Sequence, residues 1–129
     1  MFRAICKADN KARTGMIGYL TMGMTNEVYL AISDGDGEYE EIYPDTIGMN
    51  SGKHDKNGRH IYSFDVVKVN SGDEFIVEYD SSRCAFVLST IQDNNFMGYL
   101  GLFTSDSIEI VGNLFTGEEI SSDVVDNEQ

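Results

Sequence analysis

Cysteine, proline, tryptophan and basic residues are scarce in this chain. The shortages of cysteine and of basic residues exclude several structural and functional classes of protein. Its 129 residues include two Cys, one Pro, no Trp and nine Lys or Arg. Cys6 and Cys84 do not form a CxxC pair, so the sequence predicts neither a disulfide framework nor a zinc ribbon. We expect both thiols to be buried and reduced.

Long hydrophobic runs are also missing. No window approaches the roughly 18 uncharged apolar residues that a membrane-spanning helix needs. The first thirteen residues interleave bases with polar residues instead of forming the apolar region of a signal peptide. These features predict a cytoplasmic protein that does not enter a membrane.

Acidic residues are abundant, with 22 Asp and Glu giving a net charge of −13. This charge argues against binding to DNA, RNA or anionic lipid, because those contacts need a basic surface. It favours a partner protein with a basic surface instead. Residues 1–13 run against the trend, since they carry four bases and one acid.

The chain has the pattern of an all-β protein. β-branched and aromatic residues arrive in runs of five to eight between turn residues, and no long helix is predicted. We expect an N-terminal β-meander in residues 1–47, packed on a small SH3-like barrel of five strands in residues 48–116. Residues 117–129 form an acidic tail that we expect to be partly disordered.

Three short segments predict chain reversals. Thr25-Asn26 is expected to join two strands as a hairpin, and Asp34-Gly35-Asp36-Gly37 is a strong turn. Asp55-Lys56-Asn57-Gly58 contains the Asn-Gly pair that suits the positive φ angles of a tight hairpin. The chain should reverse at each of them.

An acidic strand is predicted over residues 38–43. Alternation places Glu38 and Glu40 on one face, about 6.6 Å apart, with Ile42, while Tyr39 and Tyr43 pack on the other. Such carboxylates most simply keep a surface solvated, but they also suit a basic groove and can imitate a phosphate backbone. The candidate partner-binding residues are Asp36, Glu38, Glu40, Glu41 and Asp45.

No catalytic, cofactor or metal site is predicted. His54 and His60 flank the Asn-Gly turn but lack a third ligand for zinc. A calcium loop starting at Asp34 would need Gly and Glu at its sixth and twelfth positions, where Tyr39 and Asp45 stand. Asp65 and Lys68 lie three apart, so on a strand they face opposite sides and cannot share a nuclease metal.

The central stretch PDTIGMNSGKHDKNGRHIYSFDVVKV, from Pro44 to Val69, resembles the YopX family of bacteriophage and prophage proteins. The similarity includes the start Pro44 to Gly48, the turn Asp55 to Gly58, and the Ile61-Tyr62 strand opening that leads to Asp65. It extends over nearly all of the chain. The resemblance implies a phage origin, a bacterial host cytoplasm and a β-rich fold, and it supplies no catalytic residues.

Two positions depart from the family pattern. Ile5-Cys6 stand where the family commonly has a Trp-Asp pair, and Phe64 stands where a Gly often precedes the acid that is here Asp65. Both positions concern local packing.

We therefore expect a non-enzymatic accessory protein that binds a host protein through an acidic surface, in one form as a nucleic-acid-mimicking inhibitor of a defence or nucleic-acid-handling enzyme. One alternative is a self-assembling structural subunit, in which the basic N-terminal segment of one copy meets the acidic body of the next. A third is a small-ligand-binding barrel whose mouth is lined by tyrosines such as Tyr62 and Tyr79.

Overall fold

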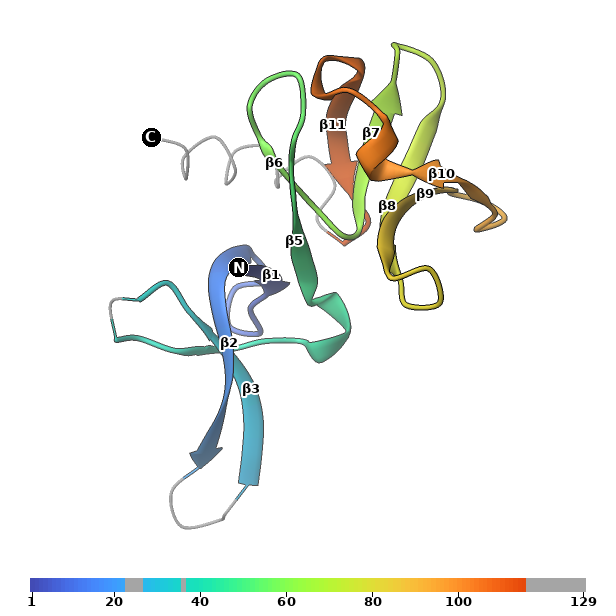
Figure 1. The fold of residues 1–129 in the computed structure, drawn as a ribbon. Helices are drawn as coiled ribbons and strands as arrows, with labels where there is room; N and C mark the ends of the chain where they lie inside the picture. The colour runs from blue at the N-terminus through green and yellow to red at the C-terminus, as the bar shows by residue number, and fades with distance from the viewer. Residues whose placement is uncertain (23–26, 36, 116–129) are drawn as a thin grey trace. The chain divides into compact units, whose positions relative to one another are not determined.

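The protein forms two compact units, each built from antiparallel strands (Figure 1). The computed structural model describes residues 1–22, 27–35 and 37–115. One unit comprises Met1–Met49 and the other begins at Asn50. The described residues contain strands and short 3-10 helices but no α-helix, so the all-β class predicted from the sequence is confirmed.

Unit 1 is a meander of antiparallel strands. Its hydrogen-bonded order is β4-β3-β2-β1, and the first residues of β5 pair with β1. The strands are β1 (Phe2–Ile5), β2 (Ala12–Met22), β3 (Glu27–Ser33), β4 (Glu40–Glu41) and β5 (Gly48–His54), with the 3-10 helix η2 (Pro44–Thr46) before β5.

The core of unit 1 is small. Ala4, Cys6, Ile32 and Ile42 are buried at its centre. Close strand packing fixes one glycine, because a Cβ atom on Gly15 would lie 2.0 Å from the carbonyl oxygen of Ser33. The Thr25-Asn26 turn, Asp36 and the acidic tail fall outside the described residues.

Unit 2 contains a hairpin and a five-stranded sheet. The hairpin joins the rest of β5 to β6 (His60–Tyr62), and the sheet has the order β10-β9-β8-β7-β11. Its strands are β7 (Asp65–Val69), β8 (Glu74–Asp80), β9 (Ala85–Thr90), β10 (Phe96–Tyr99) and β11 (Ile108–Asn113), with the 3-10 helices η3 (Leu100–Leu102) and η4 (Ser105–Ser107) between the last two.

The sheet of unit 2 is open in the described residues. Its edge strands β10 and β11 do not pair with each other, so the closed barrel expected from the sequence is not confirmed. The sheet has five strands, the number expected for the barrel. They bury one apolar cluster, made of Ile61, Val67, Val77, Leu88, Leu100, Ile108 and Ile110.

The predicted Asn-Gly hairpin is confirmed. His54 pairs with His60 across the strands, and Gly58 has a φ of 80°. That left-handed angle costs glycine little, whereas a residue with a Cβ atom is strained there. The chain therefore reverses at the position that the sequence indicates.

Two packing predictions are wrong. Ile42, predicted on the exposed acidic face, is 1% exposed, whereas Tyr39 and Tyr43, predicted to pack, are 52% and 41% exposed. The strand is also shorter than predicted, because β4 covers only Glu40–Glu41. A bridge between Ile42 and Cys6 draws the isoleucine into the core of unit 1, which reverses the two faces.

The thiols differ from each other. Cys6 is buried, as expected, and burial raises its pKa to about 11. The expectation of a buried Cys84 is wrong, because this residue lies exposed at the turn between β8 and β9 with a φ of 53°.

Phe64 adopts a backbone conformation that normally favours glycine. Its φ is 75°, and its ring meets that of Phe115 edge to face at a centroid distance of 5.0 Å. A left-handed backbone favours the glycine that the resemblance described above implies at this position. In this chain ring packing offsets part of the strain.

We predict that Phe64→Gly is more stable than Phe64→Ala by about 1 kcal/mol, because both lose the ring but only alanine keeps the strain. Urea unfolding of the two variants measures the difference. The matched control is Phe75, the second residue of β8, where alanine should be more stable than glycine. Equal stability of the two Phe64 variants would contradict the strain argument.

Candidate functional site

The predicted acidic residues gather along one segment of unit 1, which we call the acid–tyrosine segment: Glu38, Tyr39, Glu40, Glu41, Tyr43 and Asp45. Glu40 and Glu41 form β4, an edge strand that pairs with β3 through Ile32 and Ala31. Glu38 and Tyr39 precede the strand, and Asp45 lies in η2. Because Glu38 lies outside the strand, β4 does not impose the regular strand spacing predicted for Glu38 and Glu40.

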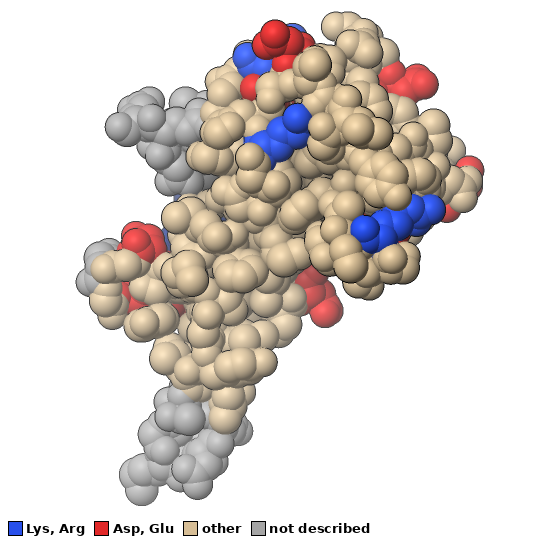
Figure 2. Space-filling model, in the orientation of Figure 1, with Lys and Arg blue, Asp and Glu red and all other residues tan. Residues whose placement is uncertain are grey.

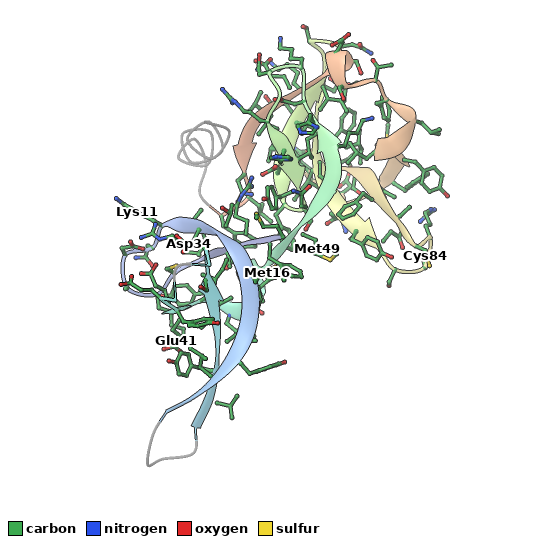
Figure 3. All side chains as sticks on the ribbon, turned by 60° about the vertical axis from the view of Figure 1, so that its left-hand side comes forward. Lys11, Met16, Asp34, Glu41, Met49 and Cys84 are labelled. Atoms are coloured by element: carbon green, nitrogen blue, oxygen red, sulfur yellow. The ribbon has the colours of Figure 1, made fainter. Side chains whose placement is uncertain are left out.

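The two strand carboxylates are held by bases of the same unit. Glu40 Oε2 accepts a hydrogen bond from Arg13 Nε at 3.0 Å, and Glu41 Oε2 accepts one from Lys7 Nζ at 2.9 Å. The hydrogen bond with Glu41 raises the pKa of Lys7 above its ordinary value. Figure 3 shows Glu41 and Lys11 on the same side of unit 1. The basic N-terminal segment thus neutralises part of the acidic segment internally.

A second carboxylate shares the Arg13 guanidinium. Asp9 Oδ2 accepts from Arg13 Nη2 at 2.7 Å, while Asp9 Oδ1 accepts from the backbone N–H of Lys11 at 3.0 Å. The backbone hydrogen bond, together with the neighbouring Arg13 charge, lowers the pKa of Asp9. Arg13 therefore bridges Asp9 and Glu40, a link that sequence spacing did not reveal.

Aromatic rings lie between these charges. The side chains of Tyr39 and Tyr43 are exposed, and Lys7 Nζ lies 5.6 Å from the centre of the Tyr43 ring. That distance is within reach of a cation–π interaction. The segment therefore offers carboxylates and aromatic faces together, and both attract Lys and Arg.

Although the net charge is −13, the face drawn in Figure 2 has no broad acidic patch among its described residues. Figure 2 shows acidic and basic side chains scattered singly over the side turned to the viewer, with neither sign forming a broad patch. The described residues on this side therefore offer a partner no broad surface of a single charge.

Two other pairs of residues, considered in the sequence as metal ligands, lie in unit 2. The rings of His54 and His60 lie 4.4 Å apart on facing strands, but no group of three or more His, Cys, Asp or Glu in the described ranges is placed to hold a metal. Asp65 is fully buried, whereas Lys68 is half-buried on the same strand.

Two buried carboxylates in unit 2 carry roles that the sequence reasoning missed. Asp55 is 3% exposed, and its Oδ1 accepts backbone N–H groups from Asn57 and Arg59, both at 2.9 Å. Its Oδ2 accepts the N–H of Ile110 in β11 at 3.0 Å. One side chain thereby closes the hairpin turn and fastens it to the sheet.

Asp65 holds the next corner of the chain. Its Oδ2 accepts the backbone N–H of Tyr62 at 2.8 Å, and its Oδ1 accepts the side-chain amide of Asn113 at 3.0 Å. The backbone N–H of Leu114 also donates to the carbonyl of Phe64 at 2.9 Å. These bonds join the start of β7 to the end of β11.

Known proteins were compared with this chain by family and by individual sequence. A family model described as YopX protein matches residues 2–119. The chain belongs to the YopX family. A search of curated proteins found no match. Two residues of the stretch that resembles the family, Asp55 and Asp65, join the hairpin and the start of β7 to β11.

The described residues include no helix with the length and apolar character required to cross a membrane.

We predict that Asp55→Ala lowers the free energy of unfolding by about 3 kcal/mol, because a buried charged acceptor is lost and N–H groups are left unpaired. Denaturant unfolding measures the change. Asp93→Asn, at an exposed position of the same unit, is the control and should stay within about 0.5 kcal/mol of the parent. A similar small effect for Asp55→Ala would contradict the fastening role.

The ion pair between Arg13 and Glu40 is predicted to be weak. Both side chains are about 40% exposed, and such pairs contribute under about 1 kcal/mol. A double-mutant cycle with Arg13→Met and Glu40→Gln should give a coupling of that size that shrinks at 1 M salt. A salt-insensitive coupling of several kcal/mol would show instead that the pair is a fixed structural element.

Proposed function

We propose that this YopX-family protein is a non-enzymatic bacteriophage accessory protein that binds a host protein with a basic surface in the bacterial cytoplasm. The contact surface is the acid–tyrosine segment of unit 1. The observation that carries the proposal is the placement of exposed Tyr39 and Tyr43 among carboxylates. Tyrosine and charge complementarity together suit a protein interface.

The internal ion pairs of the segment are compatible with partner binding. Since Glu40 and Glu41 are about 40% exposed, the cost of exchanging Arg13 or Lys7 for a cation of the partner is small. Lys7 near the Tyr43 ring illustrates the geometry that an incoming lysine or arginine would take.

Imitation of nucleic acid is the narrower form of this proposal. Its target would be a defence or nucleic-acid-handling enzyme whose basic channel normally holds phosphates. A phosphate mimic needs regularly spaced carboxylates, but of this segment only Glu40 and Glu41 lie in a strand. The segment therefore favours an interface that combines carboxylates with tyrosine rings. The tyrosine rings would then supply the specificity that irregularly spaced carboxylates lack.

An SH3-like arrangement of unit 2 is part of the same proposal. A meander of β7 to β10 is followed by 3-10 turns, and β11 then returns to pair with β7. This order supports a small barrel built around the apolar cluster, in which β10 and β11 do not pair with each other.

The proposal is tested by capture from host lysate. The triple variant Glu38→Gln, Glu40→Gln and Glu41→Gln should lose at least one specific host protein that the parent chain captures, and binding should weaken as salt rises. The matched control, Glu74→Gln, Asp93→Asn and Asp106→Asn, removes the same charge from exposed positions of unit 2 and should retain the protein.

Identical captured proteins for all three chains would contradict a role for the segment. If a captured enzyme binds nucleic acid, its inhibition at low ionic strength tests the mimicry directly, and no inhibition at any salt concentration rules it out. Thermal melting of each variant distinguishes lost contacts from lost folding.

Self-assembly is the alternative to host binding. It relied on a basic N-terminal segment meeting an acidic body, and two of those bases, Lys7 and Arg13, are engaged within unit 1. Light scattering of the pure protein decides the matter, because a strict monomer removes this alternative.

A further inference from the structure

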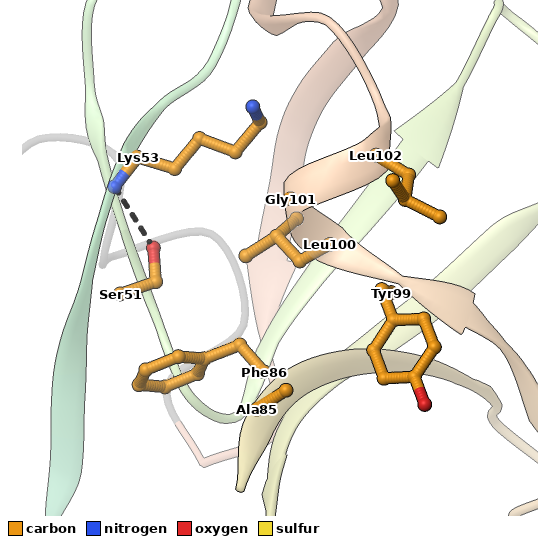
Figure 4. Close-up of a pocket in the computed structure, with 8 residues that line it drawn as sticks. All are labelled: Ser51, Lys53, Ala85, Phe86, Tyr99, Leu100, Gly101 and Leu102. Atoms are coloured by element: carbon orange, nitrogen blue, oxygen red, sulfur yellow. Dashed lines mark hydrogen bonds between the residues drawn. The ribbon is translucent and has the colours of Figure 1, made fainter. Parts of the chain in front are cut away.

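Unit 2 carries a groove whose lining residues all belong to this unit. It encloses about 520 Å³ between β5 on one side and η3 on the other, above β9 (Figure 4). The lining residues are Ser51, Lys53, Ala85, Phe86, Tyr99, Leu100, Gly101 and Leu102. The volume falls within the range typical of small-molecule sites.

The floor and walls of the groove are apolar and held in place. Leu100 is 2% exposed and belongs to the core of unit 2, which fixes the floor. The Phe86 ring meets Tyr79 edge to face at 5.2 Å, and the Tyr99 ring meets Phe96 in the same way at 5.3 Å. Because these rings are supported from outside, the groove needs little reorganisation to receive a ligand.

Lys53 is the one charged residue among the described residues that line the groove. Ser51 Oγ accepts the backbone N–H of Lys53 at 3.2 Å, which leaves the Lys53 ammonium group as the charged group at the rim. Within the described part of the chain no carboxylate pairs with Lys53, whereas Lys56 of the same hairpin pairs with Glu109 at 3.5 Å. The chain has 22 acidic residues, yet none of the described ones pairs with Lys53. Its ammonium group can therefore bind the carboxylate of a ligand in the groove.

We propose that this groove is a site for a small amphipathic monocarboxylate, with its apolar body against Phe86 and Leu100 and its carboxylate on Lys53. A neutral apolar molecule would leave the ammonium group unpaired. A phosphate ligand fits less well, because Lys53 is the only base among the described residues that line the groove and the chain is strongly acidic. The two tyrosines expected at a ligand mouth do not build this site, since Tyr62 is 3% exposed and Tyr79 lies outside the lining.

Octanoate is the probe, added to the full chain while amide chemical shifts are followed by NMR. Saturable shifts are expected at Lys53, Phe86, Tyr99 and Leu102. Lys53→Met keeps an apolar stem but removes the charge, so it should weaken octanoate binding at least tenfold. Octanol should bind the parent at least tenfold more weakly than octanoate, and Lys53→Met should leave its affinity unchanged.

Two further variants locate the site. Leu102 is 81% exposed, so Leu102→Asp is expected to fold normally while placing a negative charge at the groove and abolishing octanoate binding. Lys11→Met, an exposed lysine of unit 1, removes the same charge as Lys53→Met and should bind octanoate like the parent. The amide spectrum of each variant reports its folding independently of the ligand.

Several outcomes would overturn the proposal. Octanol binding as tightly as octanoate, or Lys53→Met binding octanoate like the parent, would show that the lysine does not recognise the carboxylate. Undiminished binding by a folded Leu102→Asp chain would place octanoate elsewhere. A short peptide with a free C-terminal leucine that binds where octanoate does not would show that the groove takes a protein end instead of a free amphiphile.

Discussion

The architecture of unit 2 depends on the hydrogen bonds that the buried Asp55 carboxylate accepts. It accepts three backbone N–H groups while buried, and one of them belongs to Ile110, 55 residues further along the chain. A buried carboxylate is costly unless its oxygens are hydrogen-bonded, so these donors and the acceptor require one another. The backbone bond from Lys56 N–H to the Ile108 carbonyl, at 2.8 Å, reinforces the same junction. Together they cover the outer edge of β11, where an unpaired strand would otherwise invite association with another chain.

A second consequence of this fastening is the corner at Phe64 and Asp65. Asp65 must reach both the Tyr62 N–H and the Asn113 amide, and the backbone meets that demand with a left-handed residue immediately before it. Glycine would take this conformation at little cost, yet this chain has a phenylalanine whose ring covers Phe115. Phenylalanine at this position therefore adds backbone strain and gains ring packing, compared with the glycine that the resemblance implies. The hydrogen bonds of the corner remain.

Sequence reasoning succeeded where the signal was local. Asn57-Gly58 predicted the hairpin, and runs of β-branched and aromatic residues between turn residues predicted the all-β class, because turn chemistry and strand propensity are set within a few residues. It failed where a distant residue decides the outcome. Alternation groups Ile42 apart from Tyr43 but cannot say which of them faces the core; the bridge to Cys6 decides that. Likewise, the burial of Asp55 depends on a donor in β11, and the pairing of Glu40 depends on Arg13 in β2.

The same limit governs how charge relates to function here. A net charge of −13 supplies long-range attraction to any basic surface, and that attraction falls off within about 10 Å at moderate salt. It does not distinguish one basic partner from another. Because Glu40 and Glu41 already hold bases of their own unit, a partner gains little from charge alone and must add contacts that Arg13 and Lys7 do not make. The exposed rings of Tyr39 and Tyr43 are where such contacts are available, so specificity in unit 1 rests on the tyrosines and encounter rate on the acids.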